Sequence, residues 1–111
     1  MNTRIEYLYR DADNYKVPNE AVVKGAASEE QIRSILDSLY EGEFFIPAAV
    51  GLPEERFSDW DDQSDHPFFE LCENDFSPTD DIPNCDISIN DLMSAFVGMK
   101  DRWEEYAVTH Y

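Results

Sequence analysis

The segment RIEYLYR, Arg4 to Arg10, decides the fold because it has the two-residue period of a β-strand. Ile5, Tyr7 and Tyr9 fall on one face of such a strand, and Leu8 adds an apolar side chain to the other face. Ile and Tyr favour extended backbone on a half-buried surface. The segment therefore predicts a strand that is covered on at least one side.

The residues that follow predict more strands joined by turns. DADN, Asp11 to Asn14, is typical of a turn, because Asp and Asn side chains bond their own backbone. Strands are expected within Glu20 to Gly25, Glu43 to Pro47 and Pro67 to Glu73. The acidic stretch Asn74 to Asp86 is interrupted by prolines and is expected to be a connection.

Two helices are predicted from their capping residues and apolar spacing. Ser28 and Gln31 match a capping box, the next apolar residues recur on one face, and Gly42 is placed to end the helix. A second helix is expected to begin at Ser88 and to continue, with apolar residues three and four apart, to Tyr106.

The order of these elements predicts the fold class. Strand, strand, helix, strand, strand, helix fits an α+β fold, with a small antiparallel sheet of about four strands and two helices packed on one face. A chain of 111 residues fits one domain, so residues 1–111 are expected to form a single acidic α+β domain.

The charge of the chain is far outside the usual range. The formal net charge is -17, from 25 acidic and 8 basic residues, whereas solubility asks for a magnitude of about 2 to 8 in a small domain. A hydrophobic content of 42% favours a folded protein over a disordered acidic tail. Such a surface repels nucleic acid and anionic membranes, so the expected partner is a basic protein.

The chain has no segment that predicts membrane insertion or secretion. No apolar run approaches the roughly 20 residues that span a bilayer, and the N-terminus turns polar too early for a signal peptide. A cytoplasmic protein is therefore expected. Cys72 and Cys85 are predicted to be free thiols.

The acidic segment from Asp59 to Asp86 is predicted to bind the partner. Its carboxylates would imitate the DNA backbone, which carries one charge per about 1.7 Å of duplex axis. Trp60 would act as an aromatic anchor that slows dissociation. The candidate residues are Asp59, Trp60, Asp61, Asp62, Asp65, Glu70, Glu73, Asp75, Asp80, Asp81 and Asp86. The alternative that these are solvated loop carboxylates without a role stays open.

Neither a metal site nor an enzyme active site is predicted. An EF-hand-like spacing of oxygen ligands occurs at Asp59, Asp61, Gln63, Asp65 and Glu70. However, Ser64 stands where the tight turn of that loop requires glycine. His66 and His110 belong to no recognisable pattern of nucleophile, base and orienting group. We therefore expect no catalytic residue, no metal and no cofactor.

Three blocks of the sequence resemble recurring segments of a family of small acidic uncharacterised bacterial proteins. The blocks are IEYLYRDADNYK (Ile5 to Lys16), GEFFIPAAVGLPEERF (Gly42 to Phe57) and DHPFFEL (Asp65 to Leu71). The resemblance implies a bacterial or phage origin and transfers no catalytic residue. Separately, the size and charge are similar to those of DNA-mimic inhibitors such as anti-CRISPR and anti-restriction proteins.

These observations together predict a non-enzymatic inhibitor in the cytoplasm of a bacterial host cell. It would mimic DNA and occupy the nucleic-acid-binding surface of a basic protein, such as a CRISPR effector complex, as a monomer or weak dimer. Two alternatives stay open: an immunity or antitoxin protein that neutralises a basic nuclease toxin, and a housekeeping acidic protein.

Overall fold

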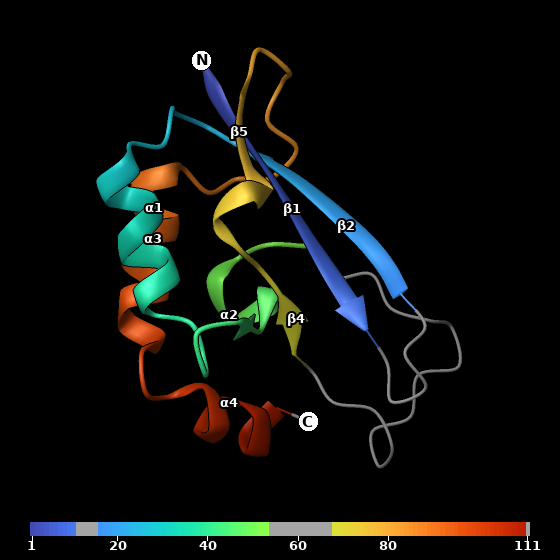
Figure 1. Ribbon diagram of the computed structural model, residues 1–111, viewed down its shortest axis with the longest axis vertical. Helices are drawn as coiled ribbons and strands as arrows, with labels where there is room; N and C mark the ends of the chain where they lie inside the picture. The colour runs from blue at the N-terminus through green and yellow to red at the C-terminus, as the bar shows by residue number, and fades with distance from the viewer. Residues whose placement is uncertain (11–15, 54–67, 111) are drawn as a thin grey trace.

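The computed structural model describes residues 1–10, 16–53 and 68–110, so the expected turn at Asp11 to Asn14 lies outside the described residues. Within the described residues, an antiparallel sheet packs against helices (Figure 1). The predicted α+β class with a small antiparallel sheet is confirmed. The helices number four in these residues, rather than the two expected.

Strand β1 is the centre of the sheet. The strands are β1 (Asn2–Arg10), β2 (Lys16–Val23), β3 (Phe44–Phe45), β4 (Phe69–Glu70) and β5 (Phe76–Thr79). β2 pairs with β1 on one side, and β5 and β4 pair with successive parts of β1 on the other side, all antiparallel. β3 then extends the sheet from β4. The sequence pattern of β1 therefore governs the sheet.

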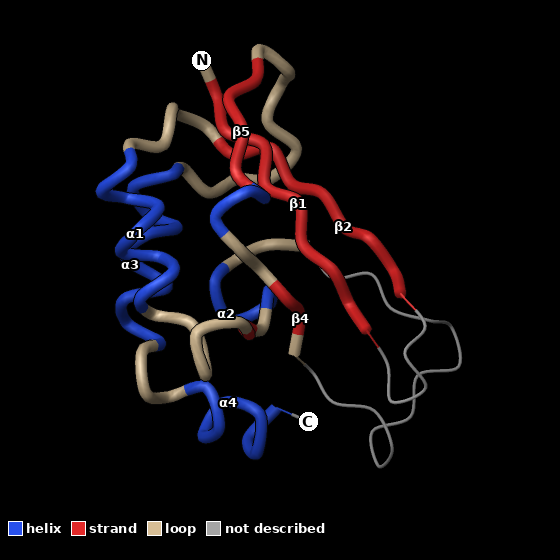
Figure 2. Tube along the Cα trace, viewed as in Figure 1, coloured by secondary structure: helices blue, strands red, loops and turns tan. Residues whose placement is uncertain are grey.

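The main helices lie on one face of this sheet. The helical elements are α1 (Glu29–Asp37), α2 (Pro47–Val50), the 3-10 turn η1 (Glu73–Asp75), α3 (Ile89–Met99) and α4 (Trp103–His110). Helices α1 and α3 run side by side beside the sheet, and α4 lies at the end of the molecule away from the N-terminus (Figure 2).

The period of two in β1 divides the sheet into a core face and a face away from the helices, which we call the outer face. Ile5, Tyr7 and Tyr9 are buried in the core, whereas Glu6 is exposed and Leu8 is half-buried. The core continues into the helices through side chains such as Ile35, Leu92 and Phe96. The expected strand faces are therefore confirmed.

Helix α1 begins as predicted and ends earlier. The Ser28 hydroxyl accepts a hydrogen bond from the Gln31 amide at 3.1 Å, and the Gln31 side chain accepts one from the Ser28 amide at 2.9 Å. The helix ends at Asp37 rather than near Gly42. It stops because Tyr40 and Phe44 exchange two backbone hydrogen bonds, of 2.7 and 2.9 Å, which close a tight turn instead.

The single C-terminal helix expected from Ser88 to Tyr106 is wrong, because the chain forms α3 and α4 with a break between them. Asp101 adopts a φ of 64°, a left-handed conformation that aspartate tolerates better than most residues. The break allows Trp103 to turn into the core, where its ring nitrogen donates a hydrogen bond to the Ser38 carbonyl at 2.7 Å. Its side chain is 1% exposed.

The expected connection from Asn74 to Asp86 is wrong in its first part, because Phe76–Thr79 forms strand β5. Phe76 pairs opposite Ile5 and packs against the core. The connection was predicted because Pro78 interrupts the segment. Proline is nevertheless compatible with a strand at the edge of a sheet. Sequence alternation over four residues was too short to reveal this strand.

Candidate partner-binding surface

The predicted partner-binding residues divide into those the structure describes and those it does not. Asp59, Trp60, Asp61, Asp62 and Asp65 lie outside the described residues. The other six are exposed or half-exposed. Around η1 are Glu70, Glu73 and Asp75, and in the connection after β5 are Asp80, Asp81 and Asp86.

Two glutamates that the sequence analysis did not select occupy the middle of the outer face. The register of β1 and β2 places Glu6 directly opposite Glu20, and both are exposed. Directly opposed side chains on antiparallel strands have Cβ atoms about 4.5 to 5.5 Å apart, and like charges at this position destabilise the sheet. The fold therefore retains a repulsive pair at its central strand.

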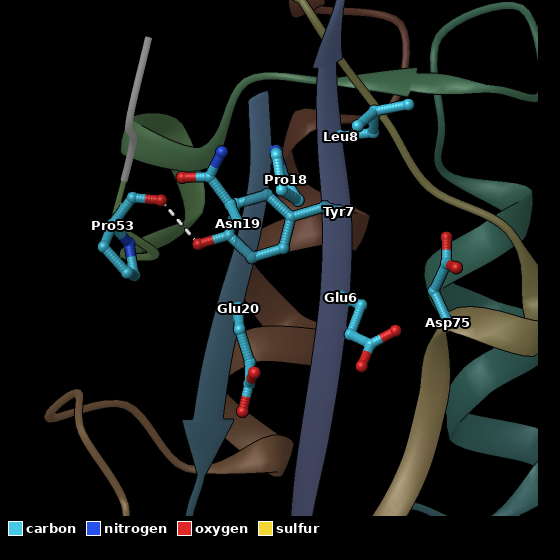
Figure 3. A pocket seen from close by; sticks show the side chains of 8 residues that line it. All are labelled: Glu6, Tyr7, Leu8, Pro18, Asn19, Glu20, Pro53 and Asp75. Carbon is cyan, nitrogen blue, oxygen red and sulfur yellow. Dashed lines mark hydrogen bonds between the residues drawn. The ribbon is translucent and has the colours of Figure 1, made fainter. Parts of the chain in front are cut away.

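These glutamates border an open hollow of about 670 Å³. Figure 3 shows Glu6, Glu20 and Asp75, from β1, β2 and η1 respectively, around this hollow. The Tyr7 hydroxyl donates a hydrogen bond to the Pro53 carbonyl at one side of it. The hollow is thus lined by three carboxylates from separate elements and by the rings of Tyr7, Pro18 and Pro53.

Arg4 partly neutralises the negative charge of these carboxylates. Its Nε atom lies 2.9 Å from Oε1 of Glu20, and its Nη2 atom forms a second ion pair with Asp81. The hydrogen bond to Asp81 and the attraction of Glu20 raise the pKa of Arg4, so the guanidinium stays charged. One guanidinium therefore joins the outer face to the connection after β5.

The three acidic residues around η1 line one hollow together, beside Leu8 of the outer face. Glu70 pairs opposite Leu8 and so lies on the outer face. Asp75 is also oriented by the backbone, because its Oδ2 atom accepts a hydrogen bond from the Cys72 amide at 2.9 Å. Glu73 lines a further hollow with Arg33 of α1. The structure therefore brings Glu70, Glu73 and Asp75 together at the border of the outer face.

The sequence predicts the face on which Glu6 lies, but it does not predict that Glu20 lies opposite. The alternation in β1 placed Glu6 on the face opposite Tyr7. Its partner on β2 depends on the pairing register, which the length and conformation of the connection between the strands determine. The sequence analysis favoured the acidic segment from Asp59 to Asp86, whose carboxylates lie close together along the chain, and so overlooked charges that meet only through strand pairing.

Sodium chloride is expected to raise the melting temperature of the free protein, because salt screens repulsion between exposed carboxylates. Replacing Glu6 by glutamine should raise the melting temperature at low salt and reduce the salt effect, since it removes one charge of the opposed pair. Thermal melts at 0.02 and 0.5 M sodium chloride measure both changes. Glu105→Gln, at an exposed site in α4, is the matched control and should change little. A melting temperature that falls with salt would contradict this description.

The described residues offer no alternative site with stronger chemistry. Among them, no group of three His, Cys, Asp or Glu side chains is arranged to hold a metal ion. Cys72 and Cys85 are free thiols, as predicted, and burial is the main cause that raises the pKa of each. A raised pKa disfavours the thiolate, the reactive form of cysteine.

Comparison with protein-family models, with curated proteins and with solved structures finds no match. In the described part of the chain, no helix has both the length and the apolar character needed to cross a bilayer.

Proposed function

We propose that this protein is a non-enzymatic inhibitor that mimics DNA and occupies the nucleic-acid-binding surface of a basic bacterial defence protein, such as a CRISPR effector. The observation that carries the proposal is the opposed pair Glu6 and Glu20, beside Asp75, on the exposed outer face. A basic partner would relieve this repulsion on binding, so charges that cost stability in the free protein favour the complex.

The charge of the whole chain supports the same interaction. A net charge of -17 gives attraction toward basic grooves at long range, which accelerates association with such a partner. The carboxylates of the outer face come from strands and from η1, so the backbone that carries them is ordered. Charges on an ordered backbone imitate a phosphate backbone better than charges on a disordered tail, because only their side chains remain to be ordered on binding.

Competition with DNA tests the proposal. The test uses purified guide-RNA-loaded CRISPR effectors of several types, with binding of this protein measured by interferometry. At least one effector is expected to bind, with an affinity that falls as salt rises, and its target duplex should displace the protein. A panel in which no effector binds, or in which bound duplex leaves the affinity unchanged, would contradict DNA mimicry of these targets.

A further inference from the structure

The connection between β5 and α3 contains an exposed apolar side chain, Ile82. Ile82 is 88% exposed, the highest value among the large apolar side chains of the described residues. It lies in the segment 80–86, which we call the apex loop, and which extends from the end of the molecule where the chain begins (Figure 1). Burial of this side chain would gain roughly the free energy of transferring isoleucine from water to an apolar environment.

The apex loop is fixed to β1 on the near side of Ile82. The Asn2 side chain donates a hydrogen bond to the Asp81 carbonyl at 2.9 Å, and the Asp81 amide donates one to the Thr79 hydroxyl at 3.1 Å. The Asp81 carboxylate also pairs with Arg4. The residue that precedes Ile82 is therefore held by its backbone and by its side chain.

The far side of the loop is fixed to the edge of β2. The Asn84 amide donates to the Val22 carbonyl at 3.0 Å, and the Val22 amide donates to the Asn84 side chain at 2.9 Å. The Cys85 thiol adds a weak contact to the same carbonyl at 3.4 Å. Ile82 and Pro83 thus lie between two anchored residues, Asp81 and Asn84. The proline ring restricts the backbone further. The loop presents Ile82 in a preorganised position.

The charges around Ile82 indicate the chemistry of the surface that it fits. Asp80 and Asp86 are exposed, and neither forms an ion pair with a described residue. Arg4 connects Asp81 with Glu20, so the loop adjoins the acidic outer face. An apolar side chain surrounded by carboxylates complements an apolar depression that is bordered by lysine or arginine.

We propose that the apex loop is a second contact with the same basic partner, in which Ile82 enters an apolar pocket bordered by basic side chains. This proposal rests on the proposed function. The carboxylates of the outer face accelerate association, and the buried isoleucine slows dissociation, because anchors that are desolvated in the complex govern the off-rate. Preorganisation of the loop limits the entropy lost when the anchor is buried.

Dissociation kinetics of Ile82→Ser test this assignment. The effector that binds the wild type is immobilised, and the variant is expected to dissociate at least tenfold faster with an association rate changed less than twofold. Val108→Ser is the matched control, because Val108 is 84% exposed but lies in α4, at the other end of the molecule. Its dissociation rate should equal that of the wild type.

The outcomes separate this proposal from the proposed function. Equal dissociation rates for Ile82→Ser and the wild type would overturn the role of the apex loop and leave DNA mimicry intact. Failure of the wild type to bind any effector would instead overturn the proposed function, and the loop assignment with it. A slower association rate with unchanged dissociation would also overturn the anchoring role of the apex loop, because the loop would then act through electrostatic steering.

Discussion

Replacement of Trp103 by alanine is expected to lower the free energy of unfolding by about 3 to 5 kcal/mol, the usual cost of removing a buried aromatic side chain. Trp103 is 1% exposed, its ring packs against Phe96, and its ring nitrogen donates a hydrogen bond to Ser38. The substitution removes these contacts and leaves a buried carbonyl without its donor. Since a domain is stable by only about 5 to 15 kcal/mol, much of that stability would be lost.

Chemical denaturation measures this effect, and two variants define its origin. Trp103→Phe keeps much of the ring volume but removes the hydrogen bond, so its stability should lie between those of wild type and Trp103→Ala. Val108→Ala changes an exposed side chain in the same helix and should cost less than about 0.5 kcal/mol. If Trp103→Ala were as stable as Val108→Ala, the result would contradict the burial of Trp103 in the core.

Removal of three charges from the outer face is expected to slow association with the partner by about tenfold or more, because charge complementarity acts mainly on the association rate. The variant combines Glu6→Gln, Glu20→Gln and Glu70→Gln, which keep the size of each side chain. Association is measured by stopped flow at low salt. The deficit should shrink at high salt, where steering is screened for wild type and variant alike.

A second triple variant separates local charge from net charge. Glu30→Gln, Asp37→Asn and Glu105→Gln remove the same number of charges from exposed positions in α1 and α4. Association of this control should slow by less than about threefold, because its charges lie away from the outer face. Equal deficits in the two variants would show that net charge alone attracts the partner, and the outer face would lose its assigned role.

The sequence predicted those parts of the fold that depend on local pattern. The faces of β1 follow from alternation between adjacent residues, and the start of α1 follows from Ser28 and Gln31, which bond each other within one turn. The break before Trp103 was missed, because apolar spacing continues across it and the left-handed Asp101 is selected by tertiary packing. Strand β5 was missed since its pairing with β1 joins residues far apart in the chain.

The candidate surface was predicted in part. Counting charges along the chain found Glu70, Asp75 and the acidic residues of the apex loop. It missed Glu6 and Glu20, because their opposition arises from strand register rather than from sequence proximity. Ile82 was missed for a related reason: its exposure depends on the hydrogen bonds that hold Asp81 and Asn84 at the sheet. Contacts across the sheet therefore add most of what the sequence did not predict.

Order of addition is the most direct measurement of DNA mimicry. The protein is added to a guide-RNA-loaded effector either before or after its target duplex, and DNA binding is followed in time. Protein added first should block the duplex. Protein added second should act only as fast as the duplex dissociates, because both ligands require the same basic side chains. Equally fast inhibition of a preformed DNA complex, with the duplex still bound, would contradict the account.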